Sequence, residues 1–315
     1  MNPDNPYPIR FQALKMGAAA ARVLTRSGQG YVNAVFKRCF YCEINDNFIC
    51  IGSPTLGMCP LNVTTSMPEG DIRVFPGLVT GMAVRVCGDY VRIGGERFLL
   101  KTDGGGVWLP PPPSATDPQK IKSGLNALEK VAAPRLPKDG LGRFIDTFPF
   151  PTLRTEPVLT QAAWPLKRLQ GWLRQSLADP QNIQDPDIFS WKRLLGLGPG
   201  LTPSGDDLVG GVMLGLHSLG CFPIIKTLSS AITQVLAEST NPISAAHLRC
   251  AMEGTGSKTA HSAINAILSG NRKEISQIPV DIEKIGHTSG WDMLAGIVIV
   301  FRLWLESAEA CQSAA

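Results

Sequence analysis

Hydrophobic and polar residues alternate at short intervals in the first third of the chain. Seven short runs rich in β-branched and aromatic residues are separated by turn sequences such as residues 45–47 and 94–96, often at hairpin spacing. The runs are residues 31–36, 39–44, 48–51, 72–75, 82–86, 90–93 and 97–100. This pattern predicts a small β-domain, either a barrel or a sandwich. Residues 10–26, which precede it, are helix-like by propensity.

A stiff proline-rich segment separates this region from a helical one. Four consecutive prolines, Pro110 to Pro113, favour polyproline II and exclude a helix or a central strand. We therefore expect an α+β protein, with an N-terminal helix and β-domain at residues 1–112 and a mainly helical domain at residues 113–315. Helices are predicted at residues 120–132, 159–178, 187–195, 208–219, 224–238, 244–253, 258–268 and 292–307, with an irregular interval at 134–157.

The helical domain is organised around a glycine-rich stretch, residues 196–207 (GLGPGLTPSGDD), and the apolar run 208–219 that follows it. A glycine-rich loop before a helix N-terminus presents unpaired N–H groups and a positive dipole end, so it suits an anion. Ser204 with Asp207 resembles a capping box. Three glycines lie within the apolar run, although each costs about 1 kcal/mol relative to alanine in a helix. The run therefore predicts a buried helix in close contact with a neighbour.

A similar string recurs 85 residues further along the chain. Ser289-Gly290-Trp291-Asp292, followed by MLAG, repeats the pattern of Ser204-Gly-Asp-Asp207, followed by LVGG. Both strings precede apolar residues typical of a buried helix. They predict paired helix N-termini that face a common pocket.

Four residues of these two strings are candidate catalytic groups: Asp206, Asp207, His287 and Asp292. Adjacent carboxylates could bind Mg²⁺ through water or position a substrate amide, or they could simply be acidic residues in the first turn of a capped helix. His287 suits general acid–base chemistry because histidine titrates near neutral pH, or it could cap a helix by hydrogen bonding. An acid pair would repel a bound anion unless a cation or the helix dipole compensated.

A third polar segment, residues 239–244, contains Thr240 and Asn241 and leads to Ser244, a plausible N-cap of the next helix. The candidate ligand-binding residues from all three segments are Gly198, Gly200, Thr202, Ser204, Gly205, Thr240, Ser244, Ser289 and Gly290. No metal site is predicted. Cys39 and Cys42 are three apart in a strand pattern and would point to opposite faces, so small buried hydrophobic residues are the better interpretation of the cysteines.

Charge and composition narrow the classes of partner. The 315 residues carry a net charge of +4 without a long basic run, which argues against a nucleic-acid interface. The N-terminus has no secretory signal pattern, and the longest apolar run, residues 293–305, is too short for a bilayer and contains Arg302. We expect a cytoplasmic protein without a membrane partner.

The three motifs together resemble the AllH-like family, bacterial proteins of formerly unknown function. The resemblance is carried by GLGPGLTPSGDD at 196–207, by Thr240 to Ser244, and by the Gly-His-x-Ser-Gly-x-Asp pattern that ends at Asp292. The middle motif departs from the family pattern, because Asn241 stands where a second threonine is expected. The β-type half matches only in general layout.

The resemblance implies a subunit of oxamate carbamoyltransferase, in purine and allantoin breakdown, that works with FdrA-like and YlbE-like subunits. The reaction would be phosphorolysis of oxalurate to oxamate and carbamoyl phosphate, or its reverse. Small anions of this kind suit glycine-flanked helix N-termini, with Asp207 or Asp292 on the carbamoyl amide. Two alternatives stay open: a non-catalytic scaffold, and a small-anion binding subunit of another catabolic complex.

Overall fold

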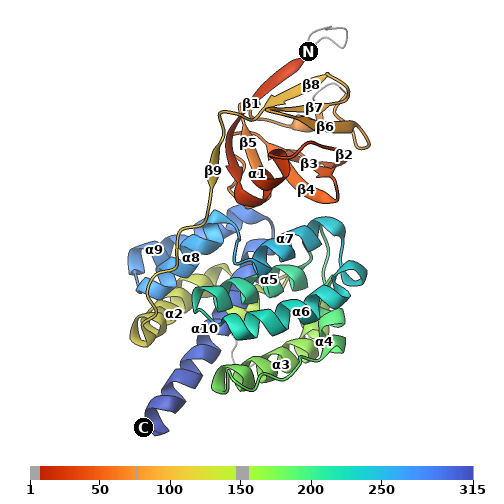
Figure 1. Cartoon of the computed structure of the whole chain (residues 1–315). Coiled ribbons are helices and arrows are strands. Elements are labelled where there is room, and N and C mark those ends of the chain that lie inside the picture. Colours follow the sequence, from red (N-terminus) through yellow and green to blue (C-terminus); the bar gives the residue numbers. More distant parts are fainter. Residues whose placement is uncertain (1–7, 75–76, 147–155, 315) are drawn as a thin grey trace. The chain divides into compact units, whose positions relative to one another are not determined.

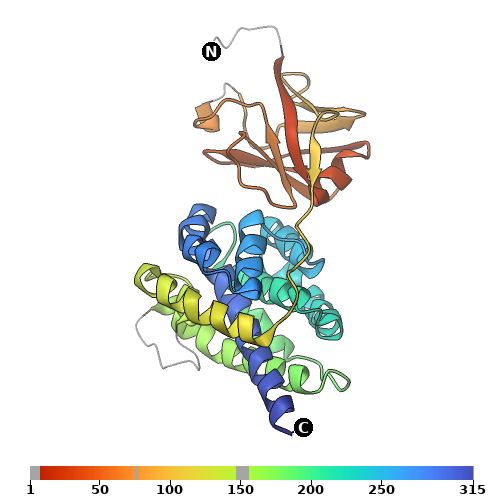
Figure 2. The ribbon, with the colours of Figure 1, turned by 90° about the vertical axis from the view of Figure 1, so that its left-hand side faces the viewer.

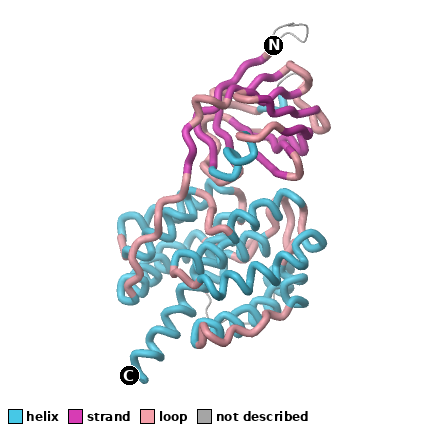
Figure 3. Tube along the Cα trace, viewed as in Figure 1, coloured by secondary structure: helices cyan, strands magenta, loops and turns pink. Residues whose placement is uncertain are grey.

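The computed structural model describes residues 8–74, 77–146 and 156–314. The chain forms two compact units that divide between Pro110 and Pro111. Strands are confined to the first unit, and the second consists of helices and loops (Figures 1 and 3). The predicted α+β class is therefore confirmed.

The first unit is a closed barrel. Its strands are β1 (Ile9–Gly17), β2 (Gly28–Val35), β3 (Cys39–Ile44), β4 (Asn47–Gly52), β5 (Asn62–Thr65), β6 (Ala83–Cys87), β7 (Tyr90–Ile93), β8 (Phe98–Lys101) and β9 (Gly106–Trp108), with helix α1 (Ala18–Leu24) after β1. The hydrogen-bonded order is β5-β4-β3-β2-β6-β7-β8-β1, and β1 returns to pair with β5. Of the two architectures predicted, the barrel is the one observed.

Strand β1 closes the barrel because it has different partners along its length. Residues 9–12 pair with β8 in parallel, and residues 13–16 pair with β5 antiparallel, with an irregularity between Ala13 and Lys15. Alternate side chains such as Phe11 and Ala13 point into the core. The helix predicted over residues 10–26 is thus wrong up to residue 17. Strand pairing on both sides outweighs helix propensity there, and only α1 is helical.

Two other expectations in this unit need correction. The strand predicted at 72–75 is a short 3₁₀ helix, Ile72–Val74, and Phe75 lies outside the described residues. Strands β5 and β9 were not predicted. Both are short and neither alternates clearly: every residue of β5 is buried, whereas two of the three in β9 are exposed. Short strands of this kind carry little period-2 signal.

The second unit is a helical bundle. Its helices are α2 (Pro118–Ala132), α3 (Pro157–Ala178), α4 (Ile188–Leu194), α5 (Ser204–Ser218), α6 (Phe222–Ser239), α7 (Pro242–Met252), α8 (Lys258–Ser269), α9 (Arg272–Ile282) and α10 (Ser289–Ala314). Helix α9 was not predicted. The predicted irregular interval holds two 3₁₀ turns, Ala133–Arg135 and Gly142–Ile145, and residues 147–155 lie outside the described residues. The last turns of α10 extend beyond the neighbouring helices (Figures 1 and 2).

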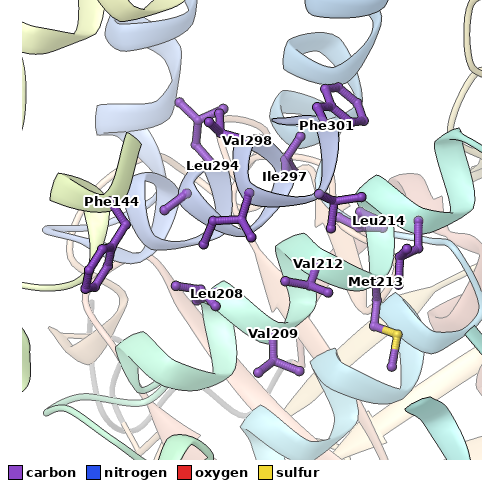
Figure 4. Packing of buried hydrophobic residues seen from close by; sticks show 14 of the residues in the cluster. Phe144, Leu208, Val209, Val212, Met213, Leu214, Leu294, Ile297, Val298 and Phe301 are labelled. Carbon is purple, nitrogen blue, oxygen red and sulfur yellow. The ribbon is translucent and has the colours of Figure 1, made fainter. Parts of the chain in front are cut away.

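Helices α5 and α10 form the centre of this bundle. Every residue of α5 from Ser204 to Leu216 is buried, as the apolar run predicted. Side chains such as Leu208, Val212, Leu294 and Ile297 fill the space around the crossing (Figure 4). A broad apolar core thus holds the first turns of both helices in place.

Two glycines allow the backbones to touch, and they do so reciprocally. A Cβ on Gly211 of α5 would overlap the carbonyl oxygen of Met293, and a Cβ on Gly296 of α10 would overlap that of Leu208. Gly211 and Gly296 occupy the same position in the two repeated strings, and so do Leu208 and Met293. The sequence repeat is therefore a spatial repeat with approximate two-fold symmetry.

Candidate functional site

The glycine-rich loop lies between α4 and α5. Gly198 and Gly200 have φ values of 109° and 102°, which favour glycine, and Gly200 has open space where a side chain would be. The loop closes on the helix start through a hydrogen bond from the Gly205 N–H to the Leu197 carbonyl, 2.9 Å. The helix itself begins at Ser204 with Pro203 as N-cap, and no side chain caps it. The capping box predicted for Ser204 is therefore wrong, and its hydroxyl is used elsewhere.

Asp206 ties three segments together from a buried position. Its carboxylate accepts hydrogen bonds from the Gly196 N–H at 2.7 Å, from the Ser244 hydroxyl at 2.6 Å and from the Thr240 hydroxyl. Burial raises the pKa of Asp206, and these donors partly oppose that rise. The structure therefore brings the predicted residues Asp206, Thr240 and Ser244 together, with both hydroxyls directed at the carboxylate.

Asn241 caps the start of α7 and also holds the glycine-rich loop. Its side chain accepts from the Ser244 N–H at 3.0 Å, so Asn241 and not Ser244 is the N-cap of α7. Its amide also donates to the Leu201 carbonyl at 2.8 Å and so holds the glycine-rich loop. The residue that departs from the family pattern is thus a structural support of the loop.

The second helix start is held in a similar way. Helix α10 begins at Ser289, and the buried Asp292 in its first turn accepts from the Leu141 N–H at 2.5 Å. The Gly142 N–H and the hydroxyls of Ser204 and Thr288 lie near Asp292 and favour its charged form. Burial nevertheless raises the pKa of Asp292 to about 6.

Asp207 and Asp292 each have a hydroxyl of the other helix nearby. The Ser204 hydroxyl of α5 opposes the rise in the pKa of Asp292, and the hydroxyls of Ser289 of α10 and of Thr202, 3.0 Å apart, oppose the rise in the pKa of Asp207. Burial raises the pKa of Asp207 well above its usual range, and the nearby Asp292 carboxylate raises it further. Among the described residues, the Oδ2 atoms of both aspartates are buried without a hydrogen-bond partner. Burial therefore shifts both acids toward the protonated form, although Asp292 is still largely ionised above pH 6.

The accessible part of this region is made of loop backbone and hydroxyl groups. Thr202 and Ser289 are half-buried, with their hydroxyl oxygens 3.0 Å apart, and Gly200 is exposed beside them in sequence. Gly290 is buried, because its backbone packs on Ile282. The aspartates, Ser204 and Gly205 are buried as well. A ligand at this face would therefore meet Gly200, Thr202 and Ser289 first.

His287 lies at the surface before α10. Its side chain is 82% exposed, and its Nε2 is 3.4 Å from an Asp139 carboxylate oxygen that is also exposed. The predicted catalytic residues thus fall into two groups, the buried aspartates and this exposed histidine.

Sequence reasoning missed one segment of the site, Gly140 to Gly142. Its backbone N–H groups bind Asp292, and a Cβ at Gly140 would lie 2.6 Å from the Asp292 carboxylate. A signal was present, because Gly140-Leu-Gly142 repeats the Gly196-Leu-Gly198 that opens the main motif. Each Gly-Leu-Gly supplies backbone donors to an aspartate in the first turn of α5 or α10.

The described residues contain no cluster of side chains that could bind a metal ion. Across residues 8–74, 77–146 and 156–314, no group of three or more His, Cys, Asp and Glu side chains is placed to hold a metal ion. None of the helices in these ranges is long and apolar enough to cross a membrane.

Residues 194–301 match the family model described as oxamate carbamoyltransferase subunit AllH. This segment is AllH-like. The match begins at the end of α4, just before the glycine-rich loop, and ends within α10, so it contains both helix starts and the Thr240–Ser244 segment. The resemblance inferred from the motifs is confirmed over these residues, while Gly140 to Gly142 and the barrel lie outside the match. No solved structure matches the chain.

Proposed function

We propose that this protein is a subunit of an oxamate carbamoyltransferase and that it binds a small anionic substrate at the paired starts of α5 and α10. The observation that carries the proposal is the AllH match, which spans both helix starts and the glycine-rich loop between α4 and α5. Carbamoyl phosphate, oxamate and oxalurate are the substrates that the family name and chemistry suggest. The carbamoyl group would pass between the oxamate nitrogen and a phosphate oxygen.

The buried acids are compatible with an anion. Ionised carboxylates at this position would repel a negative ligand, but burial raises the pKa of Asp206, Asp207 and Asp292. An acid held in its neutral form does not offset the positive end of its helix dipole, and burial favours that form for Asp207 of α5, whereas Asp292 of α10, with a pKa of about 6, is largely ionised at neutral pH. The start of α5 would therefore attract the anion at the accessible face.

The same geometry divides the predicted residues by role. Gly200, Thr202 and Ser289 are accessible and would contact the ligand, whereas Asp207 and Asp292 would position the hydroxyls of Ser289 and Ser204. His287, exposed and two residues before Ser289, would be the candidate proton carrier. A substrate phosphate could bring Mg²⁺ with it, and the ion would then offset the charge of an ionised Asp292.

A second candidate is a non-catalytic, anion-binding subunit. The observation that favours it is the burial of Asp206, Asp207 and Asp292, which removes the strongest acid–base groups from direct contact with substrate. The reacting groups would then come from partner subunits of the FdrA-like and YlbE-like kind.

Ligand-dependent unfolding tests whether the site is on this chain. Phosphate, carbamoyl phosphate, oxamate and oxalurate are added separately to the purified chain, and a ligand at one hundred times its Kd should stabilise it by about 2.7 kcal/mol. Ser289→Ala should abolish the shift. Ser276→Ala, an exposed serine on α9, is the matched control and should preserve it.

The assembled complex then separates the two candidates. If Ser289→Ala raises KM for the anion and leaves kcat unchanged, this chain binds substrate and another subunit supplies the catalytic groups. If His287→Ala lowers kcat with the same KM, the chain contributes to the chemistry. An unchanged thermal shift and unchanged kinetics in Ser289→Ala would contradict the proposed site.

A further inference from the structure

A hollow in the helical unit is lined by residues outside the glycine-rich loop. Helices α3 and α4, drawn in green in Figure 1, and the segment between them border a space of about 560 Å³. This volume is within the range of small-molecule sites in proteins. The residues that matter here are Trp164, Lys167, Trp172, Gln175, Asp185 and Trp191.

The floor of the hollow is aromatic and rigid. Trp172 and Trp191 are buried, and the Trp172 indole N–H donates to the Gln184 carbonyl at 2.7 Å, which fixes its ring. Burial and this hydrogen bond leave the floor little freedom to rearrange. A ligand would therefore enter a preformed, largely apolar space.

Trp164 stands at the rim and is 44% exposed. Phe189 contacts it edge-on with ring centroids 6.0 Å apart, and the Arg193 guanidinium lies over one face of the Trp164 ring, 5.9 Å from its centroid, so the opposite face is the one left for a ligand. These neighbours support a large aromatic side chain that the protein leaves in contact with solvent. An exposed indole held in this way offers a stacking surface for a flat ring.

The charges around the hollow balance each other. Arg168 and Asp187 approach within 3.6 Å, whereas Lys167 and Asp185 form no ion pair with any described residue. One ammonium donor and one carboxylate acceptor at the rim suit a ligand that carries both a carbonyl acceptor and N–H donors. Gln175, also at the rim, can donate and accept.

We propose that this hollow binds a guanine-type base, as the free base or as its nucleoside. Guanine is flat and neutral, and it carries two adjacent N–H donors next to a carbonyl. A carboxylate such as that of Asp185 can accept both N–H groups, and the Lys167 ammonium can donate to the carbonyl, while Trp164 stacks on the ring. Adenine lacks this donor pair, so the site discriminates between the two purines.

This inference goes beyond the proposed function and does not depend on it. The hollow contains none of the residues assigned to the anion site, and its test needs no catalytic activity. Failure of one proposal therefore leaves the other intact.

Equilibrium dialysis of the whole purified chain with guanosine, adenosine and cytidine tests the proposal. We expect guanosine to bind at least tenfold more tightly than the other two. Trp164→Ala should weaken guanosine binding by about tenfold or more, which corresponds to the loss of one base–aromatic stack. Tyr90→Ala removes an exposed aromatic residue of the barrel unit and should change nothing.

Asp185→Asn gives the sharper test, because the exposed side chain can change without disturbing the core. The amide of asparagine has one acceptor oxygen in place of two, so it cannot accept both N–H groups of guanine. The affinity for guanosine should therefore fall to that for adenosine, and the affinity for adenosine should stay the same. Circular dichroism confirms that each variant is folded. Equal binding of all three nucleosides, no binding of guanosine, or guanosine binding that survives Trp164→Ala would each overturn the proposal.

Discussion

Replacing Gly211 by alanine should strongly destabilise the helical unit. A Cβ at this position would overlap the Met293 carbonyl oxygen and lie 2.8 Å from the carbonyl carbon and 3.1 Å from the Cα of that residue. These are backbone atoms of α10, so no side-chain rotation can relieve the contact and the two helices must move apart. Separation would loosen the core around Leu208, Val212 and Ile297.

The expected loss is about 3 kcal/mol. Overpacking a well-packed core costs about 1–3 kcal/mol and occasionally more, and a contact with backbone belongs at the upper end. Alanine regains about 1 kcal/mol through helix propensity, which offsets part of a larger steric cost. For a unit of this size, such a loss lowers the melting temperature by roughly 10 °C.

Gly210, the preceding residue of the same helix, is the matched control. The nearest atom to a Cβ there is the Ala251 Cβ at 3.8 Å, an ordinary van der Waals contact. Gly210→Ala should therefore be neutral or should stabilise by up to about 1 kcal/mol. Urea unfolding followed by far-ultraviolet circular dichroism reports on the helical unit, since α1 is the one α-helix described in the barrel.

The reciprocal contact provides a further check. Gly296→Ala should cost about as much as Gly211→Ala, because its Cβ would overlap the Leu208 carbonyl oxygen and lie 2.7 Å from the Val212 nitrogen. The double variant should lose less than the sum, since one separation of the helices relieves both contacts. If Gly211→Ala is as stable as Gly210→Ala, the reasoning about backbone contact is refuted.

Three further outcomes are expected. Asp206→Ala leaves the Gly196 N–H and the hydroxyls of Thr240 and Ser244 without their acceptor. It should therefore lower the free energy of unfolding, measured by urea titration, by about 3 kcal/mol. Asp179→Ala, at an exposed position, is the control in the same titration. The pKa of Asp292 is raised from 3.8 to about 6, so its stabilisation is complete below pH 3.8 and is lost as the pH rises through about 6. The difference in free energy of unfolding between the wild type and Asp292→Asn should therefore fall by about 3 kcal/mol across that interval, and a difference that stays constant or grows would contradict the assigned shift. Asp207→Asn should show the same direction, because burial raises the pKa of Asp207 as well.

The sequence predicted the main architecture because its strongest signals are local. The runs of alternating hydrophobic and polar residues predicted most of the barrel strands. The repeated Ser-Gly-x-Asp strings predicted the starts of α5 and α10. Both depend on residues that are near one another along the chain.

The features that the sequence did not predict depend on contacts between residues far apart along the chain. β1 is a strand because β5 and β8 supply its hydrogen bonds, and its own residues favour a helix. Ser204 does not cap its own helix because Pro203 occupies the N-cap position, and the Ser204 hydroxyl lies near Asp292 of α10. Leu141 joins the site through a bond to a residue 151 positions away. No local pattern contains that information.

The crossing of α5 and α10 also has a consequence for how the protein is made. From Leu208 to Leu216, α5 has only apolar side chains and glycines, and the helix that covers one side of it is the last of the described helices to leave the ribosome. During translation, Gly211 and Asp207 of α5 therefore lack their α10 neighbours until Gly296, 85 residues after Gly211, has been added. The nascent chain is exposed to aggregation and to proteases for that time. Folding of the helical unit is completed after synthesis of α10, when both halves of the repeat are present.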